Sequence, residues 1–404
     1  MNLIAIKIEY CNLLCSPIFL KSKKKMLIIA ILIIKIINAL FLIILGLILT
    51  SFIILIDRKV LGAIQRRLAP NVTGFLGILQ QFADALKLLK KEWIFPDLAD
   101  KFLFKWSPVW ILCFSLMLLL VLGFANNIAF ANFKYSLLYF FIMSSLSVYG
   151  LLFAGWSSNS KYPLLGAQRA AAQLISYEIV MGVILTILGL YTKTFNIIKI
   201  VELQQTIWLI FPLFPVFFIF FTLMLIETNR HPFDLPEAES ELVSGYNVEY
   251  SGMLFALFIL AEYLKMFAMS IIVVLIFFGG WYIPSLSPIT SILCFFILSL
   301  KIFFFIFIFS WIRAILPRYR YDQLMKLSWK ILYPLSLSLF VFLFGLQIFL
   351  KNIYYHSFEI LINIDLYYLL NGFFLFFDNI SPRSFVFKYL LLSNYNVKLL
   401  LLYI

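Results

Sequence analysis

The sequence predicts an all-α, polytopic membrane protein of about eight transmembrane helices, with an in-plane amphipathic helix after the first span. Composition is the first observation: 64% of the residues are hydrophobic, 13% are charged, and the mean hydropathy is +1.02. These values lie far outside the range of soluble globular domains. The second observation is that the apolar runs continue for about 20 residues, whereas the strands of a membrane barrel alternate over about 10.

Eight apolar runs are readable along the chain. The first, near 26–56, exceeds the bilayer thickness at about 1.5 Å per residue, so it is either strongly tilted or begins to span near Lys35. Polar connections separate the remaining runs, whose approximate bounds are 108–131, 134–155, 168–191, 206–227, 251–283, 289–312 and 331–350.

The basic residues predict which connections share a side of the membrane. The most basic connection, Asp57 to Lys105, faces the matrix or cytoplasm by the positive-inside rule. Parity places three more on that side: those around Lys161, over 227–250 and over 313–330. The chain then divides into an N-terminal extension, expected to be interfacial, a transmembrane domain, and a C-terminal extension that is interfacial or a ninth span: 1–34, 35–350 and 351–404.

Charge and cysteine content narrow the function classes. We interpret the net charge of +13 as the basic connections that set the topology of a membrane protein, so we expect no nucleic-acid partner. The four cysteines form no CxxC pair and no second cluster: Cys11, Cys15, Cys113 and Cys294. Zinc and iron–sulfur sites draw about four ligands at tight spacing, so we expect no metal site and interpret the cysteines as apolar packing residues.

The stretch from Glu227 to Glu262 concentrates the acidic residues. It holds seven of the chain's 19: Glu227, Asp234, Glu237, Glu239, Glu241, Glu249 and Glu262. A carboxylate beside hydrocarbon is costly, so clustered acids in a membrane protein mark an ion or proton route. Pro232 and Pro236 prevent a continuous helix. We therefore expect a broken segment at membrane depth, which is tolerable only where it lines a cavity.

Two readings of these acids remain open. Closely placed carboxylates cannot all ionise at once, which suits a proton relay. A solvated acidic loop would also explain Glu237, Glu239 and Glu241, but not Glu262, about halfway along an apolar span.

A further acid lies in the fourth span. Glu178 is nine residues from Arg169, about half a turn round the helix, so the two cannot pair within that helix. It needs a partner on a neighbouring helix or must be protonated; a purely structural role is the alternative.

Two basic or amphipathic regions complete the pattern. Between Phe75 and Lys91, apolar residues recur at spacings of three and four: Phe75, Leu79, Phe82, Leu86 and Leu89. A helix there is too charged to span; it forms either an ordinary interfacial anchor or the lip of a lateral opening for an amphiphilic ligand. Arg313, Arg318 and Arg320 anchor lipid head groups or meet acids of the cavity or of a partner.

These regions resemble one protein family. The segments ETNRHPFDLPEAESELVSGYNVEYSG and RYRYDQLMK, with PN…FAD and SYE in matching order, closely resemble subunit 1 of respiratory complex I, the proton-pumping NADH:ubiquinone oxidoreductase. The resemblance runs from about residue 35 to 345. It implies an eight-helix subunit at the joint between the membrane arm and the redox arm, forming most of the quinone tunnel and the start of an acidic proton path.

Roles carry over by position. The resemblance assigns the proton path to Glu178, Glu227, Asp234, Glu237, Glu239, Glu241, Glu249 and Glu262, and quinone binding to Arg58, Gln65, Arg67, Phe82, Asp84, Phe255, Arg313 and Arg318. The chain departs from the family pattern at four places: Asp57 for the usual Glu, Leu68-Ala69 for Lys-Gly, Gln81 for Pro, and Lys265 for Asn. Lys265 follows Glu262 by three residues, so an ion pair between them is expected to keep Glu262 deprotonated.

The resemblance also implies cofactors, partners and location. The chain is expected to bind no cofactor itself, with ubiquinone as substrate and NADH, FMN and iron–sulfur clusters in partner subunits. Its partners would be redox-arm subunits at the quinone site, small membrane subunits, and lipids of the mitochondrial inner membrane; the bacterial cytoplasmic membrane is the alternative. Two other functions remain open: the membrane subunit of an energy-converting hydrogenase, and a proton-coupled transporter, which the absence of an internal repeat disfavours.

Overall fold

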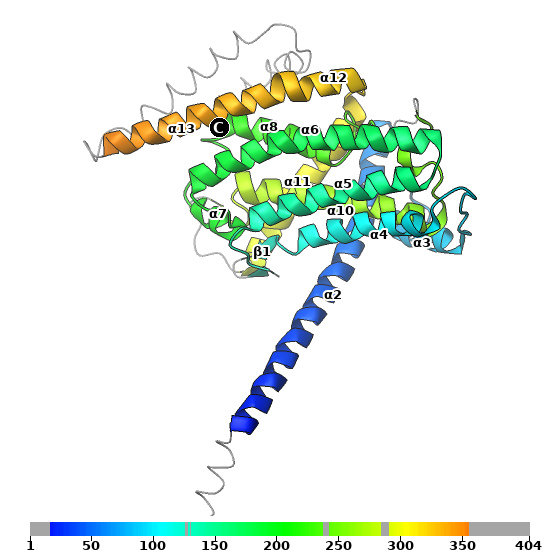
Figure 1. Cartoon of the computed structure of the whole chain (residues 1–404), viewed down its shortest axis with the longest axis horizontal. Helices are drawn as coiled ribbons and strands as arrows, with labels where there is room; N and C mark the ends of the chain where they lie inside the picture. Colours follow the sequence, from blue (N-terminus) through cyan, green and yellow to red (C-terminus); the bar gives the residue numbers. More distant parts are fainter. Residues whose placement is uncertain (1–16, 126–127, 130, 237–241, 284–290, 355–404) are drawn as a thin grey trace, which may run out of the picture. The chain divides into compact units, whose positions relative to one another are not determined.

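The computed structural model describes residues 17–125, 128–129, 131–236, 242–283 and 291–354, and it is largely helical (Figure 1). Within these residues, seven helical stretches are long and apolar enough to cross a membrane. An eighth apolar helix, α8 (Phe214–Glu227), is shorter. The long helices are α2 (Pro17–Ile64), α4 (Lys101–Leu119), α5 (Ser136–Ser157), α6 (Lys161–Thr192), α10 (Gly252–Phe277), α11 (Ser291–Ile315) and α13 (Tyr333–Tyr354). The predicted fold class is confirmed.

Short elements fill the connections. The amphipathic helix predicted between Phe75 and Lys91 is confirmed as α3 (Gln80–Lys90), but it begins later, after the separate turn η1 (Phe75–Gly77). The others are α7 (Ile197–Leu203), η2 (Gly245–Asn247), α12 (Tyr321–Lys326) and the π-helical turn η3 (Leu327–Leu332). One hairpin was not expected: β1 (Gly123–Ala125) pairs antiparallel with β2 (Ile128–Ala129). The described residues after Phe344 belong to a separate compact unit and consist of the end of α13.

Three predicted boundaries are wrong for local reasons. The second span ends at Leu119 rather than near 131, because the hairpin follows it. The fourth begins earlier, at Lys161, since Pro163 lies in the first turn, where no backbone N–H is required. The first helix continues to Ile64, so Asp57 lies inside the helix and not in the polar connection.

Hydrogen bonds join the connections that parity placed on one side. The backbone N–H of Asp100 donates to the carbonyl of Ser157 at 3.1 Å, and that of Tyr319 donates to the carbonyl of Pro232 at 3.1 Å. The second turn of α6 lies against η2 so closely that a Cβ on Gly166 would be 2.8 Å from the Tyr246 nitrogen. These connections therefore lie at one end of the helix bundle.

The bundle is organised around α10, the most buried span. It packs against α2, α4 and α11, while α4, α5 and α6 lie side by side in sequence order (Figure 1). Its carboxyl end is fixed by Lys301 of α11. The Lys301 ammonium donates to the carbonyls of Phe278, Gly280 and Tyr282 at 2.7, 2.9 and 2.9 Å. This cation satisfies the carbonyl of Phe278, the residue that caps α10, and two carbonyls of the turn that follows it.

Candidate functional site

The helix α8 ends at a buried acid. Its 14 residues reach about 21 Å, less than the roughly 30 Å of a bilayer core, and its last residue is Glu227, 7% exposed. The chain continues without regular structure through Pro236, and most of this segment is buried. The break at the prolines is thus as predicted. A non-helical backbone in an apolar bundle persists where protein encloses it.

A charged cluster joins this segment to three spans, α2, α10 and α11. The Asp57 carboxylate accepts hydrogen bonds from Arg230 at 3.3 Å, from the Tyr263 hydroxyl at 2.8 Å and from Arg313 at 2.9 Å. The Arg230 guanidinium also lies over the Tyr263 ring, 4.2 Å from its centroid. Burial lowers the pKa of Arg230, but Tyr263 and Asp57 raise it above its ordinary value, so the guanidinium stays charged. We name these four residues the Asp57 cluster.

A second cluster joins the same segment to the connection that follows α11. Arg318 donates to Asp234 at 3.2 Å and lies 3.1 Å from the His231 ring nitrogen, which is itself 3.4 Å from the Asp234 carboxylate. Next to it, the Phe233 and Tyr319 rings are stacked. Arg313 and Arg318 thus both meet acids of this chain, one of the two alternatives that the sequence left open.

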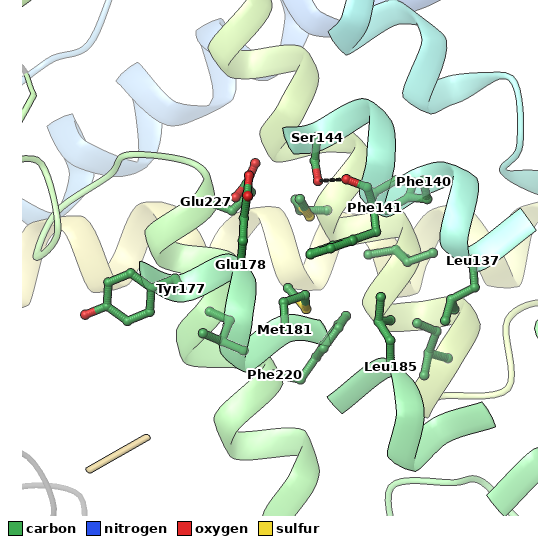
Figure 2. A pocket seen from close by; sticks show the side chains of 14 residues that line it. Leu137, Phe140, Phe141, Ser144, Tyr177, Glu178, Met181, Leu185, Phe220 and Glu227 are labelled. Atoms are coloured by element: carbon green, nitrogen blue, oxygen red, sulfur yellow. Dashed lines mark hydrogen bonds between the residues drawn. The ribbon is translucent and has the colours of Figure 1, made fainter. Parts of the chain in front are cut away.

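Two glutamates from different helices line the same pocket. Figure 2 shows the carboxylates of Glu178, on α6, and Glu227, on α8, together at one side of the pocket. The sequence predicted either a partner on a neighbouring helix or a protonated carboxyl for Glu178. The neighbouring helix brings a second acid, and no ion-pair partner of Glu178 is found among the described residues. Glu178 Oε1 and Glu227 Oε1 are buried without hydrogen-bond partners among the described residues.

The pocket is apolar apart from these carboxylates and two hydroxyls. It lies between α5, α6, α8 and α10, and its walls include Phe141, Leu185 and Phe220. The volume of the pocket is about 20 Å³. That volume holds about one water molecule. The pocket is therefore too small for an aromatic ligand. Its two carboxylates can bind and release protons.

Lys265 pairs differently from the prediction. Its ammonium lies 3.9 Å from Glu227 Oε1, on another helix, and not in an ion pair with Glu262. Glu262 accepts a hydrogen bond from the Tyr246 hydroxyl. The spacing of three residues along α10 correctly placed Lys265 and Glu262 on one side, but it could not show that α8 brings a closer carboxylate.

The residues assigned to quinone binding are distributed over several elements. Arg58 of α2 forms an ion pair with Asp84 of α3 at 2.6 Å, and Gln80 donates to the same carboxylate at 3.0 Å. Phe82 lies on α3 with half of its surface exposed. Gln65 and Arg67 are exposed just after α2, and Phe255 packs at the edge of the buried core beside α4.

The described part of the chain does not place every predicted site residue in one of these clusters. Glu237, Glu239 and Glu241 lie outside the described residues. Glu249 is half-buried just before α10. Sequence reasoning missed the roles of Arg230, Tyr263 and Tyr246. A basic side chain inside the most acidic stretch was the available signal for Arg230; no local pattern marked the two tyrosines.

Comparison with known proteins gives a consistent set of relatives. A family model described as NADH dehydrogenase matches residues 36–344. NADH-ubiquinone oxidoreductase chain 1 of Arabidopsis thaliana is 49% identical over 302 residues, which cover 74% of this chain and 92% of the plant protein. The protein of that name from Triticum aestivum is 48% identical over 300 residues, with coverage of 74% and 92%. A subunit of the NADH-quinone oxidoreductase of Rickettsia rickettsii (strain Iowa) is 47% identical over 300 residues, with coverage of 74% and 88%.

Proposed function

Because this chain belongs to the NADH dehydrogenase family, we propose that it is a membrane subunit of an NADH:quinone oxidoreductase. In that role it guides a long-tailed quinone, ubiquinone, to its reduction site and transmits the charge change into proton pumping. The chain holds no redox centre of its own in this proposal. NADH, FMN and iron–sulfur clusters belong to partner subunits, and electrons reach the quinone from there.

The proposal includes partners and a location. The redox-arm subunits at the quinone site and small neighbouring membrane subunits are the expected partners. The seven long apolar helices of the described residues suit a multi-pass membrane protein. We place it in the mitochondrial inner membrane, with the bacterial cytoplasmic membrane as the alternative, since both plant and Rickettsia relatives match it at similar identity.

The quinone route in this proposal passes beside α3. The apolar face of this helix is at least half exposed at Leu79, Phe82 and Leu86, while the Arg58–Asp84 ion pair fixes α3 to α2. An amphiphilic ligand requires this combination of an apolar surface for its tail and fixed polar groups near its head. Arg313 and Arg318 act indirectly in this arrangement. Arg318 pairs with Asp234 of the segment after α8, and Arg313 pairs with Asp57, the counter-charge of Arg230 in that segment.

One observation carries the charge-transfer part of the proposal: the carboxylates of Glu178 and Glu227 lie together at one side of a mostly apolar pocket (Figure 2). Two carboxylates that close titrate as a coupled pair, because the charge on one changes the proton affinity of the other. A charge that appears at the quinone site can therefore be passed on as a change of protonation, without any movement of a helix.

The test is a comparison of Glu178→Gln with Glu202→Gln in the assembled complex. Glu202 is an exposed glutamate on α7 and serves as the matched control. We expect Glu178→Gln to lose most quinone-coupled proton pumping while NADH oxidation by an artificial electron acceptor is unchanged, because flavin chemistry lies in a partner subunit. Equal loss of both activities would instead indicate failed assembly. Full pumping by Glu178→Gln would contradict the proposal.

A further inference from the structure

Lys265 is a cation in the interior of the bundle. It lies on α10, its side chain is 3% exposed, and apolar side chains surround it along that helix. An ammonium group in such a place is costly unless a counter-charge lies near it. Its ion-pair partner is Glu227, itself buried, at 3.9 Å.

The same cation acts on a second acid. The electrostatic neighbours of Glu178 are Glu227 and Lys265, which belong to the two other helices that meet here. The three side chains thus come from α6, α8 and α10 and share one buried site. With both carboxylates ionised the site carries one net negative charge, and one proton makes it neutral.

The geometry decides which carboxylate carries that proton. Glu227 is within ion-pair distance of the ammonium, whereas Glu178 forms no ion pair with a described residue. An arrangement with Glu227 charged and Glu178 neutral keeps the negative charge within ion-pair distance of the ammonium. The pocket beside Glu178 has room for about one water molecule, and a water there can deliver that proton to the carboxyl group or accept it.

We propose that Lys265 is a positioning residue of the proton path: its ammonium fixes the negative charge on Glu227, so that Glu178 is the carboxyl that gains and loses the transferred proton. This inference rests on the proposed function. It assigns different tasks to the two acids, which the proposed function alone does not.

The test uses three variants of the full complex: Lys265→Met, Lys265→Arg, and Lys265→Met combined with Glu227→Gln. Infrared difference spectra report protonated carboxyl groups. Lys265→Met should add one protonated-carboxyl band, because Glu227 takes up a proton when its counter-charge is removed. The band should be absent from Lys265→Arg and from the double variant.

Proton pumping gives the second readout. Without the ammonium, Glu227 ionises only at higher pH, so the pH profile of pumping by Lys265→Met should move to more alkaline pH. At neutral pH its pumping should fall roughly tenfold or more, as expected for loss of a charge about 4 Å away. Lys265→Arg should restore the wild-type profile, which a merely structural loss of packing would not predict.

The outcomes separate the inference from the proposed function. If Glu178→Gln abolishes pumping while Lys265→Met changes neither the spectrum nor the pH profile, the inference is overturned and the proposed function stands. If Glu178→Gln leaves pumping intact, the proposed function fails first. If Lys265→Met does not assemble, the double variant decides: recovery of assembly supports the buried charge pair, and lack of recovery overturns it.

Discussion

Replacing Asp57 by asparagine tests the Asp57 cluster most sharply. The Asp57 side chain is 1% exposed and is the counter-charge for two guanidinium groups. Asparagine keeps the shape of the side chain but removes its charge. Arg230, 8% exposed, is then left as a buried cation without its ion-pair partner.

The structure sets the expected magnitude. Removing one partner of a buried ion pair costs about 3–5 kcal/mol. The Arg313 side chain is 37% exposed, so solvent screens its interaction and we assign it at most about 1 kcal/mol. The expected loss is therefore about 4 kcal/mol, most of it from the Arg230 side of the cluster. Asp57→Glu, which retains the charge, should recover most of it.

The assay is the half-life of NADH:quinone activity at raised temperature, because large membrane complexes unfold irreversibly. Even if only a third of this free-energy loss lowers the barrier to unfolding, the half-life falls about tenfold. Asp322→Asn is the control, since Asp322 is exposed on α12. Equal half-lives for the Asp57 and Asp322 variants would refute the reasoning.

Three further substitutions test other parts of the structure. Lys301→Met removes three hydrogen bonds to carbonyls at the end of α10 and should shorten the same thermal half-life by tenfold or more, because each charged hydrogen bond contributes about 1.5–3 kcal/mol; an unchanged half-life would count against the contact. Gly166→Ala places a methyl group 2.8 Å from the backbone of Tyr246 and should cost about 1–3 kcal/mol, seen as less assembled complex, whereas Gly182→Ala on the same helix meets nothing within 4 Å and should assemble normally. Phe82→Ala should raise the KM for a long-tailed quinone by roughly fivefold with little effect on a short-tailed one, and an equal effect on both would argue against a tail contact at α3.

The fold was largely predictable because apolar runs and amphipathic spacing are local signals. The exposed apolar face of α3 appears in the sequence as residues three and four apart, and the structure forms that helix. Helix ends were less predictable. The residues after Leu119 are as apolar as those before it, so hydropathy alone could not show that a hairpin replaces the helix there.

The acidic residues of the candidate site could be predicted from the sequence, but their interaction partners could not. The angle between Glu178 and Arg169 on α6 indicated that the two do not pair within their helix. That a second acid, Glu227, lies near Glu178 did not follow from it. The hydrogen-bond partners of Asp57 lie 173, 206 and 256 residues along the chain, a separation at which no local spacing predicts contact. The partner of Lys265 was unpredictable for the same reason, because Glu227 of α8 lies closer to it in space than Glu262, one turn away on α10.

A density map of the assembled complex with bound quinone would test the central claim most directly. The account predicts that the quinone tail lies against Phe82 of α3, and that protein encloses Glu178 and Glu227 on every side. A quinone bound elsewhere, or a map in which these two carboxylates face lipid or open water, would contradict it.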